Sequence, residues 1–157
     1  MISYPKSVEE NDALKAWIAQ RIPDYRSGSH TVCIGIEREQ KLLAVVAWDN
    51  WRGRDIEVTF ASDNPRWATR QTIMTLLAYP FIQLGCQRVT SFVYKSNKRA
   101  RRLNEGLGFV QEGKHRDAGK NLEPVFSYGL TKRDFVAKYL KRVKDGKQET
   151  TSAAAGS

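Results

Sequence analysis

The hydrophobic positions near the start of the chain recur at helical spacing. Apolar side chains return every three or four residues between Leu14 and Ile22, which is the pattern of a helix with one buried face. Ser7, followed three residues later by Glu10, is a capping box, and Pro23 closes the segment. The sequence therefore predicts a first helix between Ser7 and Pro23.

Three short runs rich in β-branched residues come next. Thr31–Glu37 and Leu42–Trp48 are joined by a charged turn, so they predict a β-hairpin. The third run, Asp55–Ser62, alternates apolar and polar side chains, as a strand with one buried face does. A helix is predicted after it, because residues 63–65 (Asp-Asn-Pro) form an N-cap signal. Its apolar stripe is Ile73, Leu76, Leu77, Phe81 and Leu84, with a kink expected at Pro80 and an end at Gly85.

The second half continues the alternation. It predicts a strand over Arg88–Tyr94, a short basic helix over Lys98–Leu107, strands over Phe109–Glu112 and Pro124–Leu130, and a last helix from Thr131 to Val143. The order α, β, β, β, α, β, α, β, β, α predicts an α/β (α+β) fold. In such a fold a mixed sheet carries helices packed on it.

Length and composition agree with one globular domain. The 157 residues are 41% hydrophobic and 10% aromatic, which is enough to bury one core. We expect a single domain over residues 1–144 and a polar, disordered tail over 145–157. Without a long apolar stretch or a secretory leader, a cytoplasmic protein with no membrane partner is expected. Cys33 and Cys86 lie far apart outside any metal-ligand motif, which predicts buried thiols and no metal site.

Charge is unevenly distributed along the chain. The formal net charge is +9, but residues 1–65 carry −2 and the remainder +11. Basic clusters occupy residues 88–116 and 132–149. Such clusters indicate either an anionic partner or a solvated face, and the partner would be nucleic acid, anionic lipid or a phosphorylated cofactor. The C-terminal cluster consists chiefly of Lys138, Lys141, Arg142, Lys144 and Lys147.

The loop after the third strand is the first candidate binding site. A helix that begins there presents unpaired N–H groups and the positive end of its dipole, which favour a phosphate. Arg66 and Arg70 would add charge-assisted hydrogen bonds, and Thr69 a hydroxyl donor. The alternative is an ordinary capped helix with surface arginines.

A second motif lies in the basic helix. Residues 97–113 (NKRARRLNEGLGFVQEG), together with Arg116 and the strand Phe126–Leu130, resemble the acyl-CoA-binding half of the GNAT N-acetyltransferases. The likeness spans roughly residues 55–135. It is closest to the branch with the ribosomal-protein N-terminal acetyltransferases and to small phage and prophage GNAT proteins. It implies a GNAT fold with splayed central strands, and acetyl-CoA as the acyl donor.

The resemblance also implies roles for individual residues. Glu57 would be the base that takes a proton from the substrate amine. Backbone at Phe60 to Ser62 and the side chain of Asn97 would bind the pantetheine arm, while the loop Arg66–Gln71 and basic residues of the short helix would bind the phosphates. The cofactor-binding positions so implied are Phe60, Ala61, Ser62, Arg66, Trp67, Ala68, Thr69, Arg70, Gln71, Asn97 and Arg101.

The sequence departs from the family pattern at three places. The phosphate loop has no glycine, since Trp67 and Thr69 stand where small residues are expected, and Trp67 would either stack on adenine or fill the core. Asn104 occupies the catalytic position where a tyrosine often serves as general acid, and an amide cannot give up a proton. Tyr128 or Tyr94 would then substitute, unless each is only a sheet residue. Only the short segment that starts with MISYP precedes the first helix, where the family has a strand.

The predicted function is acetyl-CoA-dependent transfer of an acetyl group to an amine, that of a protein N-terminus or a lysine. Two alternatives stay open. The basic helices allow acetylation of an aminoacyl-tRNA, with nucleic acid as partner, and the departures allow a module that binds CoA or a host protein without turnover. The sequence leaves the oligomeric state open, a homodimer included.

Overall fold

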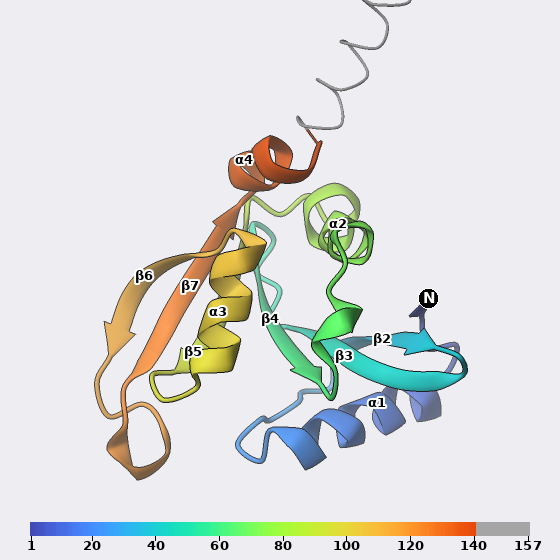
Figure 1. The fold of residues 1–157 in the computed structure, drawn as a ribbon, viewed down its shortest axis with the longest axis horizontal. Coiled ribbons are helices and arrows are strands. Elements are labelled where there is room, and N and C mark those ends of the chain that lie inside the picture. Colours follow the sequence, from blue (N-terminus) through green and yellow to red (C-terminus); the bar gives the residue numbers. More distant parts are fainter. Residues whose placement is uncertain (141–157) are drawn as a thin grey trace, which may run out of the picture.

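The computed structural model describes residues 1–140, which form one seven-stranded sheet flanked by helices (Figure 1). Along the sheet the strand order is β1-β2-β3-β4-β5-β7-β6; β4 and β5 are parallel, and the other neighbours are antiparallel. The predicted mixed, mostly antiparallel sheet is confirmed. The predicted tail over 145–157 and most of the C-terminal basic cluster lie outside the described residues. The strands are β1 (Ile2–Ser3), β2 (Val32–Arg38), β3 (Lys41–Asp49), β4 (Asp55–Ser62), β5 (Arg88–Tyr94), β6 (Val110–His115) and β7 (Val125–Thr131).

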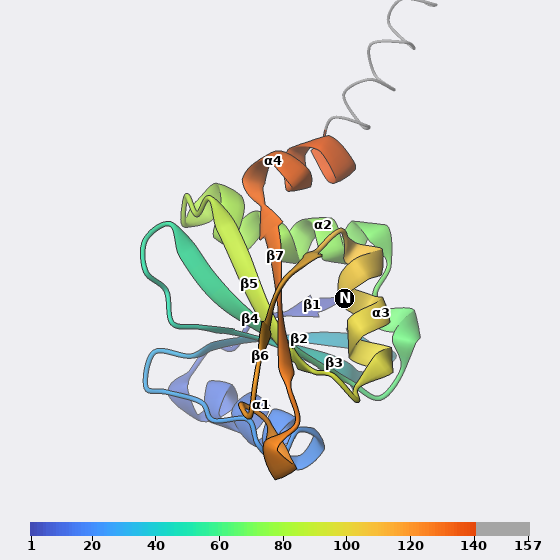
Figure 2. The same cartoon turned by 90° about the vertical axis from the view of Figure 1, so that its left-hand side faces the viewer.

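The β2–β3 hairpin forms as predicted, around a tight turn. Glu39 and Gln40 have φ of 54° and 64°, the conformation of a two-residue hairpin turn whose twist matches the flanking strands. β3 is buried on both faces, because α1 (Val8–Arg21) lies on one side of the sheet and α2 (Arg70–Ala78) on the other (Figure 2). Burial of both faces explains why Leu42–Trp48 is continuously apolar rather than alternating.

Alternation along β3 divides the core into two clusters. Val45 and Ala47 face α1 (Val8–Arg21) and pack with Ile18. Val46 and Trp48 point the opposite way and belong to the larger cluster beneath α2. The sheet therefore carries a small core on one face and a large one on the other.

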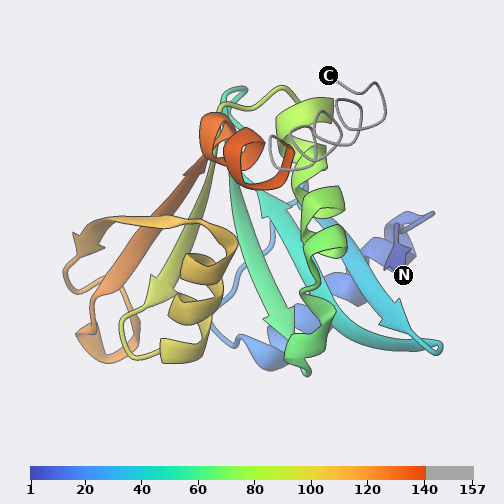
Figure 3. The ribbon, with the colours of Figure 1, turned by 45° about the horizontal axis from the view of Figure 1, so that its top comes forward.

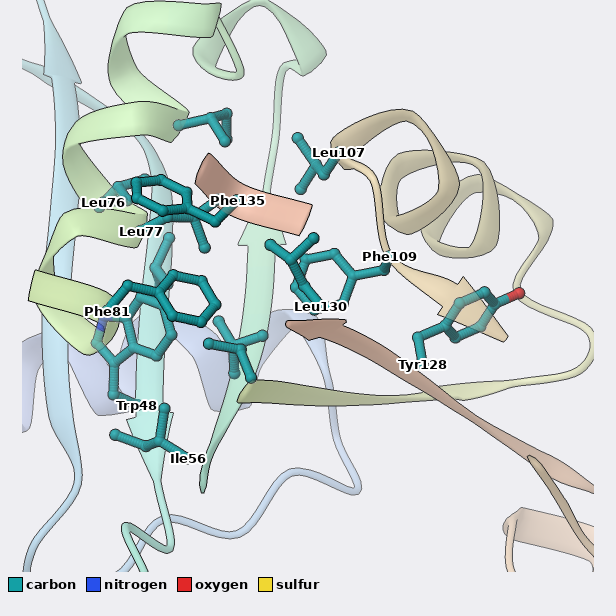
Figure 4. Close-up of a cluster of buried hydrophobic side chains, with 14 of the residues drawn as sticks. Trp48, Ile56, Leu76, Leu77, Phe81, Leu107, Phe109, Tyr128, Leu130 and Phe135 are labelled. Carbon is teal, nitrogen blue, oxygen red and sulfur yellow. The ribbon is translucent and has the colours of Figure 1, made fainter. Parts of the chain in front are cut away.

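The larger cluster has an aromatic centre. Phe81 and Phe135 stack with their ring centroids 5.0 Å apart, and both point into the cluster (Figure 4). Cys86 belongs to this cluster and Cys33 to the smaller one; both are free, buried thiols, as predicted. The two cysteines therefore act as small hydrophobic side chains on opposite faces of the sheet.

The segment after β4 differs from the single helix predicted there. Asn64 caps one 3₁₀ turn, Pro65–Trp67, and Thr69 then caps a separate helix, α2 (Arg70–Ala78). The Asn64 amide oxygen accepts the N–H two residues on at 2.9 Å, and the Thr69 hydroxyl accepts the N–H three residues on at 3.2 Å. Because two capping side chains compete in this short segment, the helix begins at Arg70 rather than beside Pro65.

The predicted kink at Pro80 takes the form of a wide helical turn. Beyond α2 the chain continues as η2 (Tyr79–Gln83), where the Leu84 N–H donates to the Tyr79 carbonyl at 3.0 Å. Pro80 has no N–H to continue the regular ladder, which favours this π-type bond spanning five residues. Gly85, with φ of 71°, ends the segment as predicted.

The second half follows the predicted order. α3 (Lys98–Leu107) ends at Gly108, whose φ of 103° is the left-handed conformation that suits glycine. β6 begins one residue later than predicted and extends to His115. The last helix begins as α4 (Lys132–Phe135) and continues as η4 (Val136–Leu140); its predicted end at Val143 lies outside the described residues. Within residues 1–140, no helix is both long and apolar enough to span a membrane.

The first five residues contain a strand that sequence analysis did not predict. β1 pairs antiparallel with β2, with Ile2 opposite Ile36 and Ser3 opposite Gly35. The strand is two residues long, so local pattern carries almost no signal for it. A strand therefore precedes α1, as the family resemblance would require.

β4 and β5 separate after a short stretch of pairing. Their ladder contains Asp55 opposite Arg88, then Ile56 and Glu57 opposite the next two residues of β5, and stops there. Beyond Glu57, β4 stays paired with β3, while β5 stays paired with β7. Figure 3 shows the two strands close together at one end and well apart at the other. The central strands are therefore splayed, as the resemblance implied.

Candidate functional site

Two adjoining cavities lie where β4 and β5 separate. One has a volume of about 460 Å³ and is lined by β4, β5, α3 and the segment that follows α1. The other, of about 450 Å³, is lined by the end of β4, the 3₁₀ turn after it and α3. Phe60, Asn97 and Leu103 belong to both walls, so the cavities meet along β4 and α3.

The charged side chains on the two walls differ in sign. We call the first the acidic cavity, because three carboxylates face it: those of Asp24, Asp49 and Glu57. It also has two arginines, Arg21 and Arg26. We call the second the basic cavity, because its charged lining residues are all arginines: Arg21, Arg99 and Arg102.

Glu57, the predicted base, reaches the acidic cavity from β4. It belongs to the last β4–β5 pair, so it stands where the strands begin to part. Its Oε2 accepts a hydrogen bond from Asn50 Nδ2 at 2.6 Å, and its Oε1 lies 3.7 Å from Arg52 Nη1. The side chain is 23% exposed. Glu57 therefore has both the arginine contact of a surface strand residue and the position that a base would need.

Asp49 is a second carboxylate on this wall, and sequence analysis missed it. It lies directly opposite Glu57 in the β3–β4 ladder. The Tyr25 hydroxyl donates to it at 2.7 Å, and the Thr31 hydroxyl donates to its other oxygen. Burial, and then the hydrogen bond to Asp49, raise the pKa of Tyr25, so this phenol stays protonated. Hairpin register could have revealed Asp49. Asp49 ends β3 and Glu57 lies near the start of β4, so antiparallel pairing of the two strands places the carboxylates side by side.

Tyr94 lines the acidic cavity from the end of β5. Its hydroxyl donates to the carboxylate of Asp24, in the segment after α1. That hydrogen bond raises the pKa of Tyr94 above its ordinary value. Of the two tyrosines proposed as proton donors, Tyr94 thus lines the cavity, and its hydroxyl hydrogen is directed at Asp24.

Tyr128, the other proposed donor, lies elsewhere. It is fully buried on β7, and its hydroxyl donates to Glu105 Oε1 at 3.3 Å. Figure 4 shows that hydroxyl pointing away from the aromatic cluster. Tyr128 belongs to the wall of neither cavity.

Asn104 does line the acidic cavity, at 2% exposure. Its Nδ2 donates to the Ala100 carbonyl at 2.8 Å, one turn earlier in α3. Its Oδ1 is buried and has no hydrogen-bond donor among the described residues. The position where a general acid was expected therefore holds a hydrogen-bond acceptor.

The predicted phosphate loop uses its own backbone donors internally. The Arg66 N–H donates to the Asn64 side chain at 2.9 Å, and the Trp67 N–H donates to the Asn64 carbonyl at 3.4 Å. The Ala68 N–H donates to the Pro65 carbonyl at 3.2 Å, and the Thr69 N–H to the Trp67 carbonyl at 3.0 Å. This loop is therefore a closed turn rather than an open ring of N–H groups.

Most of the remaining loop residues lie away from the cavities. Trp67 is 2% exposed and packs on Phe60 with ring centroids 5.8 Å apart, so it is a core residue that forms part of the basic cavity wall. The Arg70 guanidinium donates to the Lys138 carbonyl at 2.6 Å, which ties α2 to the last helix. The loop residues that line neither cavity are Arg66, Ala68, Thr69, Arg70 and Gln71.

The predicted pantetheine-binding residues do lie together. Phe60, Ala61 and Ser62 line the basic cavity opposite Asn97, whose side chain caps α3 by accepting the Ala100 N–H at 3.0 Å. Arg101 turns away from this cavity: it lies over the Phe126 ring at 4.6 Å and donates to the Lys95 carbonyl. Sequence analysis selected Arg101, but its neighbours Arg99 and Arg102 are the ones on the cavity wall.

No protein-family model and no curated protein matches the sequence. Solved structures do match. A chimera of the Vibrio cholerae spermidine N-acetyltransferase SpeG with hSSAT aligns over 88% of this chain and 99% of its own, at 19% identity and a TM-score of 0.62. Mutant forms of the spermidine/spermine N-acetyltransferase SpeG from Vibrio cholerae align over 81% and 80%, at 21% identity and 0.59. A probable acetyltransferase aligns over 83% and 75%, at 21% identity and 0.61.

These likenesses concern the arrangement of the backbone. The neighbours share the open, mostly antiparallel sheet and flanking helices, so the chain has the GNAT fold that the motif over residues 97–113 predicted. Only about a fifth of the aligned residues are identical, so the likeness does not identify a branch of the family. What the chain does must be argued from its own site.

Proposed function

We propose that this protein transfers an acetyl group from acetyl-CoA to a primary amine. The observation that carries the proposal is the opening between β4 and β5, where an acidic and a basic cavity adjoin. The donor carries phosphates and the acceptor is a cation, so each reactant suits one cavity. The fold shared with N-acetyltransferases supports this interpretation.

The residues around the opening suit acetyl-CoA. The arginines of the basic cavity can pair with phosphate oxygens. Beyond Glu57 the β4 backbone has no β5 partner, so Phe60–Ser62 can hydrogen-bond an amide-bearing arm such as pantetheine. Apolar contacts are offered by Phe60, Trp67 and Leu103. When bound, acetyl-CoA supplies the acetyl group as an activated thioester.

Glu57 performs the proton transfer in this proposal. An amine is largely protonated in water near neutral pH and must lose a proton before it can act as a nucleophile. The Glu57 carboxylate, fixed by Asn50 at 2.6 Å, can accept that proton directly or through one water. Asp49 and Asp24 lie on the same wall and attract the amine cation.

When the amine attacks the thioester, the C–S bond breaks and CoA leaves as a thiolate; Tyr94 is the side chain that can donate a proton to this thiolate. Its hydroxyl faces the acidic cavity, and its raised pKa keeps it protonated. Asn104 offers only an amide, which is not an acid. The hydrogen bond to Asp24 orients the Tyr94 hydroxyl before a reactant arrives.

For the acceptor we retain the amine of a protein N-terminus or a lysine. A polyamine is a second candidate, favoured by the three carboxylates of the acidic cavity, which suit a ligand with several positive charges. The SpeG neighbours, named as spermidine N-acetyltransferases, favour it too. Rates with peptide and polyamine acceptors at equal concentration decide between the two.

Release of free CoA in the presence of different amines tests the proposal. The acceptors are spermidine, a lysine peptide with a blocked N-terminus, a peptide with a free N-terminus, and an aminoacyl-tRNA. We expect Glu57→Gln to slow the reaction by roughly 100-fold or more, because the amide keeps the contact with Asn50 but cannot take a proton. The dissociation constant of acetyl-CoA for this variant should stay within about twofold of the wild-type value. The control Glu9→Gln, at an exposed residue of α1, should keep both this constant and the wild-type rate.

Three outcomes would redirect the proposal. A protein that binds acetyl-CoA but acetylates none of the offered amines would favour a non-catalytic module. An unchanged rate for Glu57→Gln would remove Glu57 from the proton transfer. Transfer to aminoacyl-tRNA alone, weakening steeply with salt, would favour the RNA-directed alternative.

A further inference from the structure

We infer that Arg99 and Arg102 of α3, rather than the loop after β4, hold the phosphates of the CoA donor. The inference rests on the proposed function and deepens it, because it assigns the donor's charged end to two residues of this chain. Both arginines line the basic cavity. The GNAT resemblance assigns the phosphates to the loop Arg66–Gln71. That loop differs from the two arginines because most of its N–H donors are already used and only Trp67 of its residues lines the cavity.

The loop already uses most of its backbone donors. Four consecutive N–H groups, those of residues 66–69, already donate to oxygens of the same segment. A phosphate there would have to break these hydrogen bonds, and each broken bond would leave a carbonyl or amide oxygen to be solvated anew. The Arg70 side chain is bonded to the Lys138 carbonyl at 2.6 Å, on the side of the last helix. The segment is stable as a closed turn and gains little by opening.

Helix α3 offers what the loop lacks. Arg99 and Arg102 are three residues apart, so they share one face of the helix with Ala100 and Leu103, which also line the cavity. Both side chains are exposed, and within residues 1–140 neither forms an ion pair with a carboxylate. Guanidinium groups present several N–H donors in a planar fork that matches phosphate oxygens. Arg102 Nε donates to the Lys98 carbonyl at 3.4 Å, while its two terminal nitrogens and the Arg99 guanidinium have no hydrogen-bond partner within residues 1–140 and can meet a ligand.

The third arginine of this wall differs from these two. Arg21 Nε and Nη2 donate to the two oxygens of Asp63, at 2.7 and 2.8 Å. The charge of Arg21 is therefore paired with a carboxylate of the same chain, and this ion pair joins α1 to the residue that follows β4. Arg99 and Arg102 therefore supply the net positive charge of the cavity wall.

The test is the dissociation constant of CoA measured by calorimetry. We expect Arg99→Ala/Arg102→Ala to raise it at least tenfold, and Arg99→Lys/Arg102→Lys to raise it less, because lysine keeps the charge but not the fork. The charge-matched control, Lys114→Ala/Arg133→Ala, removes two exposed basic residues that line neither cavity and should leave the dissociation constant within twofold of the wild type. Thermal unfolding of each variant checks that the fold is kept.

Dephospho-CoA, which lacks the 3′-phosphate, identifies which phosphate is held. A loss in the double variant that persists with dephospho-CoA assigns the arginines to the pyrophosphate. A loss that disappears assigns them to the 3′-phosphate. Either result supports the inference.

Two results would overturn it, and they are distinguishable. If wild-type protein binds CoA and the alanine double variant binds it equally well, the inference fails while the proposed function stands; a large loss in Arg66→Ala would then return the phosphates to the loop. If wild-type protein binds no CoA at near-millimolar concentration, the proposed function fails and the inference fails with it.

Discussion

The loop Asp63–Thr69 and the helix α3 border the same basic cavity but present it with different groups. Both contain polar and basic residues, and an asparagine caps each: Asn64 caps the 3₁₀ turn of the loop and Asn97 caps α3. In the loop the backbone donors of residues 66–69 bind oxygens of the loop itself. In α3 the side chains of Arg99 and Arg102 line the cavity, and within the described residues 1–140 neither forms an ion pair with a carboxylate. Charge alone does not distinguish these regions, but the destinations of their hydrogen-bond donors do.

The difference teaches where a binding site can persist when its motif is lost. A glycine-rich loop binds phosphate through open N–H groups, and that geometry disappears once Trp67 enters the core and the segment closes into a 3₁₀ turn. A helix face can take over the same role with side chains, because it borders the same cavity.

Trp67→Ala should have the largest effect, a loss of about 3–5 kcal/mol in the free energy of unfolding, because it empties a site buried to 2% exposure against Phe60. Urea unfolding measures it. The control Trp51→Ala, at a tryptophan 58% exposed, should change stability by less than about 1 kcal/mol. A stable Trp67→Ala variant that has lost CoA binding would mean that this ring serves adenine instead of the core.

Asn104→Leu should have a small effect on stability, because it removes a buried acceptor that has no donor. The Nδ2 bond to the Ala100 carbonyl is lost, but that carbonyl keeps its regular helical partner. We expect the free energy of unfolding to stay within about 1 kcal/mol of wild type or to rise. A loss above about 2 kcal/mol would indicate that Oδ1 has a partner in the folded protein, and would weaken the contrast with the loop.

Asp63→Asn should have the smallest effect on stability, and that effect should depend on pH. The hydrogen bond from Arg21 lowers the pKa of Asp63 below its ordinary 3.8, so its carboxylate stabilises the folded state above that pH. As pH falls through the lowered pKa, Asp63 is protonated and the contribution is lost. The difference in melting temperature between wild type and variant should therefore be constant from pH 7 to 5 and shrink below pH 4. A difference that grows on acidification would contradict this role.

Much of the fold could be predicted because its signals are local. The β2–β3 hairpin, the cap at Ser7 and the end of α3 at Gly108 each depend on a few neighbouring residues. β1 could not be found, since its two residues are held by pairing with β2 more than thirty residues away. The late start of α2 was missed because Asn64 and Thr69 are both good caps, and only tertiary packing of Trp67 between them decides that both are used.

The site was predictable only along single elements. Glu57 and Phe60–Ser62 lie on one strand, and the structure brings them together with Asn97 at one opening. Asp24 and Asp49 lie on other elements, so their place beside Glu57 is seen only once the sheet is assembled. Basic residues of α3 were implied to bind phosphate, and Arg101 was the one named. Successive helical residues turn by about 100°, so Arg101 lies on the opposite face of α3 from Arg99.

The central claim is that acetyl-CoA binds at the opening between β4 and β5. Isothermal titration of purified wild-type protein with acetyl-CoA tests it most directly, with Arg99→Ala/Arg102→Ala as the paired sample. The account predicts saturable one-to-one binding below millimolar concentration in the wild type, and binding at least tenfold weaker in the variant. No heat of binding at near-millimolar acetyl-CoA in the wild type would contradict it.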